Sequence, residues 1–259
     1  MPVTIEEFGD ELYAALRERR TVPPLTSRAD LSIEDAYKIS LRLRDRRIAD
    51  GDEVIGKKIG VTSKPVQDAL GVHQPDFGFL MRSMRHDSGC ELPISTQLIQ
   101  PRAEGELALV LKRDLIGPGV APADVMAATE CVLPCFEIVD SRIHDWKIRI
   151  QDTIADNASS GLFVLGREAA DPRRVDFVTC GIVVEKNGEL LSTGAGAAAL
   201  GSPLHSVAWL ANTMGAFGVP LKAGEVILSG SLVPLEPVRA GDVMRLQIGT
   251  VGGASVRFA

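Results

Sequence analysis

The stretch that decides the fold is residues 100–111, which read QPRAEGELALVL. After Pro101 its second half alternates with a period of two, and this pattern predicts a strand. Successive side chains of a strand point to opposite faces, so Glu104 and Glu106 share one face. Two carboxylates this close repel each other and are costly to remove from water. Either a cation lies between them or they face solvent.

A third carboxylate, Glu137, stands alone in the apolar run CVLPCFEIV of residues 131–139. An unpaired ion in such a run is costly or takes up a proton. Three acidic side chains from two strands, with no Cys or His between them, are typical of a hard-cation site for Mg²⁺ or Mn²⁺ rather than zinc. Alternatively, Glu104 and Glu106 line a solvated edge and Glu137 pairs with an arginine. Spacing alone leaves both interpretations open.

Composition narrows the class of protein. The chain has 259 residues, 45% of them hydrophobic, enough for one large domain with an appendage or for two modest domains. Its 28 basic and 34 acidic side chains are mixed along the sequence, with no basic block, which argues against a nucleic-acid partner. Without a targeting pattern or an apolar run of membrane length, we expect a cytoplasmic protein that binds no membrane. Free thiols are expected at Cys90, Cys131, Cys135 and Cys180.

The N-terminal region is predicted to be helical. Apolar residues at helical spacing predict a helix from Thr4 to about Arg20. A second helix begins after Ser32, a favourable N-cap residue, and ends at Gly51. Residues 1–53 therefore form a small helical region.

The rest of the chain, residues 54–259, is predicted to be a mixed, mainly antiparallel β core, because strands outnumber helices there. Strands at residues 177–185 and 189–192 flank the turn Lys186-Asn187-Gly188, which is typical of a hairpin. A helix is predicted at residues 122–130. The fold class is α+β.

A strand at residues 54–62 contains a candidate functional lysine. Glycines inside a strand indicate a bulge or a close approach by a ligand or by backbone. Lys58 shares a face with Gly56 and Gly60, which leaves space around its ammonium group, whereas Lys57 lies on the other face. Lys58 is therefore the better candidate of the two.

Three polar segments are ambiguous from the residues alone. Asp76 follows Pro75 in a turn-rich loop and is either a turn residue or a functional one. Asp156 and Asn157 suit a pocket wall, and equally an Asx turn. Residues 229–231, Ser-Gly-Ser, end a short strand and offer hydrogen-bond donors to an anion.

Taken together and in order, the motifs of this chain resemble a known family. They are residues 56–62 (GKKIGVT), 74–78 (QPDFG), Glu104-x-Glu106, Glu137, 155–159 (ADNAS) and 229–231 (SGS). The chain resembles the 2-oxopent-4-enoate hydratase/decarboxylase family, within the fumarylacetoacetate-hydrolase-like superfamily. The resemblance covers essentially the whole chain and implies a distorted β-roll core.

The resemblance also implies residue roles. The metal-ligand positions, for Mg²⁺ or Mn²⁺, are Glu104, Glu106 and Glu137. The catalytic positions are Lys58, Asp76 and Asp156, with Asp76 the first candidate for acid/base chemistry. The candidates for substrate binding are Ser159, Ser160, Ser229, Gly230 and Ser231. Whether burial lowers the pKa of Lys58 or the glutamates raise it is left open.

The activity that the resemblance implies is metal-dependent hydration of 2-hydroxypenta-2,4-dienoate to 4-hydroxy-2-oxopentanoate, in meta-cleavage degradation of aromatic compounds. The segment 74–77 and the pair Asp145-Trp146 resemble the hydratase branch. The alternatives are a 4-oxalocrotonate decarboxylase and a non-catalytic partner subunit. The family further implies a homo-oligomer and a complex with a paralogous decarboxylase. The sequence does not determine the dienoate's substituent or which side chain protonates C5.

Overall fold

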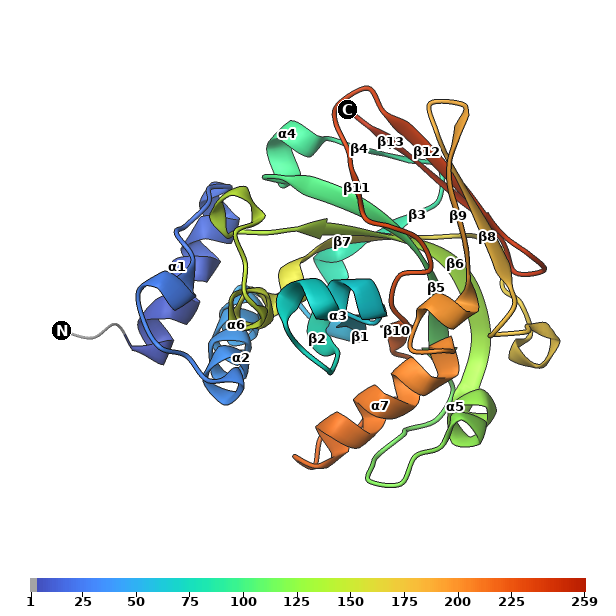
Figure 1. The fold of residues 1–259 in the computed structure, drawn as a ribbon, viewed down its shortest axis with the longest axis horizontal. Helices are drawn as coiled ribbons and strands as arrows, with labels where there is room; N and C mark the ends of the chain where they lie inside the picture. The colour runs from blue at the N-terminus through green and yellow to red at the C-terminus, as the bar shows by residue number, and fades with distance from the viewer. Residues whose placement is uncertain (1–3) are drawn as a thin grey trace.

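The computed structural model describes residues 4–259, which form a helical layer beside two β-sheets (Figure 1). The first two helices lie at one side of the molecule, and the strands fill the other side. The helices are α1 (Ile5–Glu18), α2 (Ile33–Ala49), α3 (Lys64–Leu70), α4 (Ile94–Gln97), α5 (Pro122–Ala128), α6 (Ile150–Ala155) and α7 (Pro203–Gly215).

The larger sheet carries the predicted site residues. Its main path runs β2-β1-β10-β5-β6-β7-β3, and β11 adds to β5. Most of its pairs are antiparallel, while β1 with β10 and β3 with β7 are parallel. Its strands are β1 (Val54–Gly60), β2 (Asp76–Met81), β3 (Arg85–Asp87), β5 (Pro101–Leu111), β6 (Thr129–Asp140), β7 (Ser160–Leu165), β10 (Val226–Leu228) and β11 (Glu236–Pro237).

A smaller sheet packs on one face of the larger sheet. Its order is β4-β13-β12-β8-β9, and its strands are β4 (Cys90–Leu92), β8 (Gly181–Lys186), β9 (Glu189–Ala195), β12 (Val243–Ile248) and β13 (Gly252–Phe258). The two sheets approach closely at Gly105 of β5, where a Cβ would lie 2.6 Å from Cδ1 of Ile182. Glycine at this position therefore allows the sheets to pack, and the opposite face of β5 is left for the glutamates.

The helical layer has its own hydrophobic cluster. Both long helices begin with a capping box, at Thr4 with Glu7 and at Ser32 with Asp35, and the Ser32 N-cap is as predicted. Phe8 of α1 and Ile39 of α2 pack in a cluster that also includes residues of α6. Figure 1 shows α6 against α2. Residues 4–53 thus share their core with a helix from the middle of the chain. The status of residues 1–53 as a separate unit stays a prediction, and the first three residues lie outside the described part of the chain.

The α+β class is confirmed, but several local predictions need correction. The strand predicted at residues 54–62 ends at Gly60, before Val61 with its φ of +57°, and Asp76 begins β2 instead of lying in a loop. The second helix ends at Ala49 rather than Gly51. Residues 177–180 are not part of a strand, because the Asp176 carboxylate accepts the N–H groups of Val178 and Thr179 and folds this segment into a turn. The helix α5 ends at Ala128, since β6 already begins at Thr129. The strand β9 extends to Ala195 rather than Ser192.

No helix in the described part of the chain has both the length and the apolar character that crossing a membrane requires.

Candidate metal centre

The register of two central strands brings the three glutamates together. On β5 and β6, Glu104 lies opposite Glu137, and Glu106 lies opposite Cys135. Register partners in a sheet share a face, so all three carboxylates point to the same side. Their ligand oxygens lie within 4.8 Å of one another. Glu106 and Glu137 are buried, while Glu104 is partly exposed and marks the open side of the cluster.

The buried oxygens of this cluster lack hydrogen-bond partners. Oε2 of Glu106 accepts the N–H of Gly230 at 2.9 Å, but its Oε1 has no hydrogen-bond partner in the described structure. The same is true of both carboxylate oxygens of Glu137. Buried carboxylates without partners are costly, and an all-oxygen donor set is the one that hard divalent cations prefer. The residues present therefore fit such a cation.

Lys58 of β1 and Asp76 of β2 lie beside the three glutamates, and in the sheet order β10 separates β1 from β5. Nζ of Lys58 is 3.4 Å from Oε1 of Glu137, and both side chains are buried. Gly60 pairs with Asp76, and a Cβ at Gly60 would collide with Oδ1 of Asp76 and lie 3.2 Å from Nζ of Lys58. The glycine-interrupted strand thus leaves space for these two charged groups.

Burial and mutual repulsion govern the charges of this site. Burial opposes the charge of Lys58, but the carboxylates around it, Glu137 first, outweigh that effect and raise its pKa. Burial and the charge of Glu137 raise the pKa of Glu104 to about 7 and that of Glu106 well above its ordinary value. Burial also raises the pKa of Asp76, although Lys58 acts in the opposite direction. The site therefore contains one buried ammonium group among several carboxyl groups.

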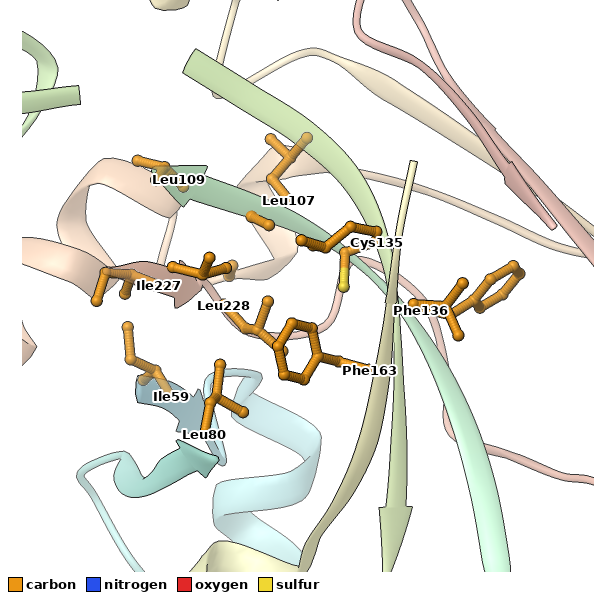
Figure 2. Close-up of a cluster of buried hydrophobic side chains, with 14 of the residues drawn as sticks. Ile59, Leu80, Leu107, Leu109, Cys135, Phe136, Phe163, Ile227 and Leu228 are labelled. Carbon is orange, nitrogen blue, oxygen red and sulfur yellow. The ribbon is translucent and has the colours of Figure 1, made fainter. Parts of the chain in front are cut away.

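Apolar side chains continue the same face of the sheet beyond the charged groups. Phe163 is the register partner of Glu137 on β7, and Leu228 is that of Lys58 on β10. Both are buried, as is Cys135. Figure 2 shows Cys135, Phe163 and Leu228 turned toward one another, with Phe136 on the opposite side of β6. The carboxylates thus adjoin a dry hydrophobic cluster, which excludes water from one side of the site.

Asp156, expected in a pocket wall or an Asx turn, forms a buried ion pair with Arg142. Its carboxylate accepts the Nε–H of Arg142, and it accepts the backbone N–H of Arg142 at 2.8 Å. Burial raises the pKa of Asp156 to about 6, against the effect of Arg142. Because both carboxylate oxygens of Asp156 are engaged, this geometry favours a structural role over the expected catalytic one.

Most of the expected substrate-binding hydroxyls are engaged within the chain. Oγ of Ser160 donates to the carbonyl of Asn157 at 2.7 Å, and Oγ of Ser231 donates to that of Val233 at 2.6 Å. Oγ of Ser159 lies 3.2 Å from Oγ1 of Thr153. Their part in substrate binding stays a prediction.

Residues 229 and 230 end β10 beside the glutamates. Oγ of Ser229 is buried and has no hydrogen-bond partner among the described residues. Gly230 has a φ of +99°, and a Cβ there would collide with the Thr62 side chain, so the bond from its N–H to Glu106 requires glycine.

Sequence reasoning did not identify Arg142 or Tyr37 as parts of this region. Arg142 is the largest fully buried side chain, and nothing in the sequence around it signals burial. The ring of Tyr37, from α2, stacks on Phe77 at 4.4 Å, next to Asp76. Burial and the charge of Asp76 raise the pKa of Tyr37. A tyrosine in an amphipathic helix carries no sign of such a neighbour.

The fumarylacetoacetate (FAA) hydrolase C-terminal family matches residues 57–259 of the chain. The chain belongs to the fumarylacetoacetate hydrolase family. A relative named 2-hydroxypent-2,4-dienoate hydratase, from Pseudomonas putida, is 70% identical over 83% of this chain and 97% of its own length. A 2-hydroxyhexa-2,4-dienoate hydratase from Comamonas testosteroni is 57% identical over 98% and 97% of the two chains.

One solved structure has nearly the same fold as this chain. It is 4-oxalocrotonate decarboxylase from Pseudomonas putida G7, complexed with magnesium and adipate. It superposes with a TM-score of 0.95 at 36% identity, over 98% of this chain and 97% of that chain. The fold is therefore one that a decarboxylase also has, and it does not by itself assign a reaction to this chain.

Proposed function

We propose that this protein is a hydro-lyase that hydrates 2-hydroxypenta-2,4-dienoate to 4-hydroxy-2-oxopentanoate with the aid of a divalent cation. The observation that carries the proposal is that Oε1 of Glu106 and both carboxylate oxygens of Glu137 are buried without hydrogen-bond partners among the described residues, with Nζ of Lys58 3.4 Å from Oε1 of Glu137. Buried groups of this kind fit a bound cation and an anionic substrate. Identities of 70% and 57% to two dienoate hydratases support hydration over decarboxylation.

Glu104, Glu106 and Glu137 would hold the cation, Mg²⁺ or Mn²⁺, through carboxylate oxygens. When bound, the cation supplies charge stabilisation to the carboxylate and 2-oxygen of an α-keto acid, worth several kcal/mol. Lys58 would donate a hydrogen bond to the same oxygens, because its raised pKa keeps it protonated. Ser229 and Ser231 remain candidates for binding the substrate.

Asp76 is suited to move protons because burial raises its pKa and its Oδ1 has no hydrogen-bond partner in the described structure. It would donate its proton to C5 while the 2-hydroxyl loses its own, which yields a conjugated ketone. Its carboxylate then accepts a proton from the water whose oxygen bonds to C4, and the proton lost by the 2-hydroxyl returns at C3. Asp76 ends protonated, ready for the next turnover.

A monocarboxylate substrate agrees with the charges on this face of the sheet. Among the described residues whose register places them on that face, Lys58 is the only buried cation, because Arg85 is exposed and Arg102 is partly exposed and lies over the Trp146 ring. A dicarboxylate such as 4-oxalocrotonate would have to share this one buried cation between two carboxylates, which is costly in an apolar surrounding. We further propose that the protein works as a homo-oligomer in the degradation of aromatic compounds and associates with a paralogous decarboxylase.

The test is a direct assay with matched substrates. The purified protein with Mg²⁺ or Mn²⁺ is given 2-hydroxypenta-2,4-dienoate, and loss of diene absorbance and formation of 4-hydroxy-2-oxopentanoate are followed. We expect turnover that a chelator abolishes and that Glu106→Gln lacks. Release of CO₂ from 4-oxalocrotonate at a higher kcat/KM would instead assign the decarboxylase reaction. Failure of calorimetry to detect metal binding would contradict the proposed centre.

A further inference from the structure

The strand that begins with Asp76 is an edge strand. β2 ends the path of the larger sheet, and on its inner side it pairs with β1, where Gly60 lies opposite Asp76 and Lys58 lies opposite Gly78. On its outer side no strand of the described chain pairs with it. Backbone groups on such an edge have no ladder partners on that side. Another group is therefore needed to hold the outer side of β2, the strand that begins with Asp76.

The side-chain amide of Asn157 occupies that outer side. Its Oδ1 accepts the N–H of Phe79 at 2.7 Å, and its Nδ2 donates to the carbonyl of Phe79 at 2.9 Å. Asn157 is buried, and so is Phe79. One amide thus supplies both the donor and the acceptor that a residue on a neighbouring strand would supply. Among side chains of this size, the carboxylate of Asp lacks the donor and the isobutyl group of Leu lacks both.

The backbone that carries Asn157 is rigidly held. Asn157, Ala158 and Ser159 all have φ values between +50° and +55°, a left-handed conformation that costs free energy and needs support from its surroundings. Arg142 provides it: its guanidinium donates to the carbonyls of Asp156 and Ser160, as well as to the Asp156 carboxylate. The amide of Asn157 therefore projects from a fixed platform.

The chain runs from this left-handed segment directly into β7, which lies far from β2 in the order of the larger sheet. Ser160, which follows the left-handed segment, is the first residue of β7, and β7 pairs with β6, the strand of Glu137. The contact at Phe79 therefore joins the β2 edge to the β6–β7 side and closes the curl of the sheet. The approach is tight: a Cβ at Gly78 would collide with the carbonyl oxygen of Asn157.

We propose that Asn157 is a positioning residue for the reaction. By clamping Phe79, it fixes β2 and thereby sets the position of Asp76 relative to the three glutamates, which lie on β5 and β6. Asn157 acts through β2, since the side-chain amide hydrogen bonds described for it go to Phe79. The inference rests on the proposed function, since it concerns how the same site is assembled.

The chain contains a matched control for this role. Asn212, on α7, clamps Val120 in the same way: its Oδ1 accepts the Val120 N–H at 2.9 Å and its Nδ2 donates to the Val120 carbonyl at 2.9 Å. That clamp holds the loop before α5 and involves neither β2 nor the strands of the glutamates. Asn157→Ala and Asn212→Ala each remove two hydrogen bonds of one kind. Asn157→Ala is expected to lower Tm more, because Asn157 is buried and the change places alanine in the left-handed conformation, so the comparison rests on kcat.

Of the two alanine variants, only Asn157→Ala is expected to impair catalysis. We expect kcat to fall about tenfold to a hundredfold, because small misplacements of catalytic groups have effects of that size. The Mg²⁺ dissociation constant and KM should change by less than about threefold, since the glutamates stay in place. Asn212→Ala should leave kcat within about twofold of the parent value. Asn157→Asp keeps the volume and removes the donor, so its kcat should also fall.

The measurements are kcat and KM for the dienoate, Mg²⁺ affinity by calorimetry and Tm, for the parent and all three variants. If Asn157→Ala proves too unstable to purify, the kcat of Asn157→Asp is compared with that of Asn212→Ala instead. If the parent enzyme is active and the Asn157 and Asn212 variants lose kcat equally, the positioning role is wrong while the proposed function stands. The same conclusion follows if an Asn157 variant loses Mg²⁺ affinity as strongly as it loses kcat. A parent enzyme that does not hydrate the dienoate overturns the proposed function and this inference with it.

Discussion

Two adjacent lysines of β1, Lys57 and Lys58, have different partners because their side chains point to opposite faces of the sheet. Lys58 lies among the carboxylates of the site, and Lys57, on the other face, forms a buried ion pair with Glu225. The alternation of side chains along a strand predicts this division from the sequence. The partner of Lys57 is not predictable in this way, because Glu225 is brought to it by the parallel pairing of β10 with β1.

Substitution of each lysine by methionine should separate the two roles. Lys58→Met removes a hydrogen-bond donor to the substrate, and we expect kcat to fall by about a hundredfold to a thousandfold. Lys57→Met leaves Glu225 without its partner and should lower the free energy of unfolding by about 1–3 kcal/mol while kcat is nearly retained. Urea unfolding and steady-state kinetics check both variants. The assignment of Lys58 fails if Lys57→Met is the more impaired enzyme.

Asp76→Asn tests the acid/base assignment at the same scale. Calorimetric Mg²⁺ affinity should be unchanged, whereas kcat should fall by about a hundredfold or more. Because burial raises the pKa of Asp76, the protonated form that donates to C5 persists to higher pH than for an exposed aspartate. In the parent enzyme, kcat should therefore decrease as pH rises through this pKa, and the variant should lack that decrease. Turnover within about twofold of the parent would assign the proton transfer to another group.

At the scale of elements, the contacts of the loop between α6 and β7 could not be predicted from the sequence. The segment Asp156-Asn157 was open to two interpretations, a pocket wall or an Asx turn. The structure shows a third: Asp156 binds Arg142 and Asn157 binds the edge of β2. Neither partner is close in sequence, and local patterns do not reveal contacts that only the tertiary fold creates. The same limit explains residues 177–180, where the Asp176 side chain forms a turn in place of the predicted strand.

The Arg142–Asp156 pair should be a main contributor to the stability of this region. Arg142→Met leaves a carboxylate in the interior without its partner, and we expect the free energy of unfolding to fall by about 3–5 kcal/mol. Arg173→Met removes an exposed ion pair with Asp171 and should leave the stability almost unchanged. Urea denaturation of the two variants provides the comparison. Equal, small effects would mean that the buried pair contributes little.

At the scale of the whole molecule, the candidate metal centre lies where the sheet order brings separate parts of the chain together. The predicted alternation located Glu104, Glu106 and Lys58 on their strands, and the α+β class followed from the count of strands. The strand order was not predictable, because β10 enters between β1 and β5 from the far end of the sequence. Assembly of the centre therefore depends on long-range strand pairing, and metal binding should be coupled to global stability.

This coupling gives a prediction for the melting temperature. At a Mg²⁺ concentration about a hundredfold above Kd, the folded state gains about 2.7 kcal/mol, or roughly 5–10 °C in Tm for a chain of this length. Glu106→Gln removes a buried carboxyl group whose ionisation is costly beside Glu137 and Glu104, so the metal-free variant should melt at a higher temperature than the metal-free parent yet hardly respond to Mg²⁺. Thermal unfolding with and without Mg²⁺ measures both effects. A full Mg²⁺-dependent shift in Glu106→Gln would place the stabilising cation elsewhere, because the three carboxylates can then no longer be its common ligands.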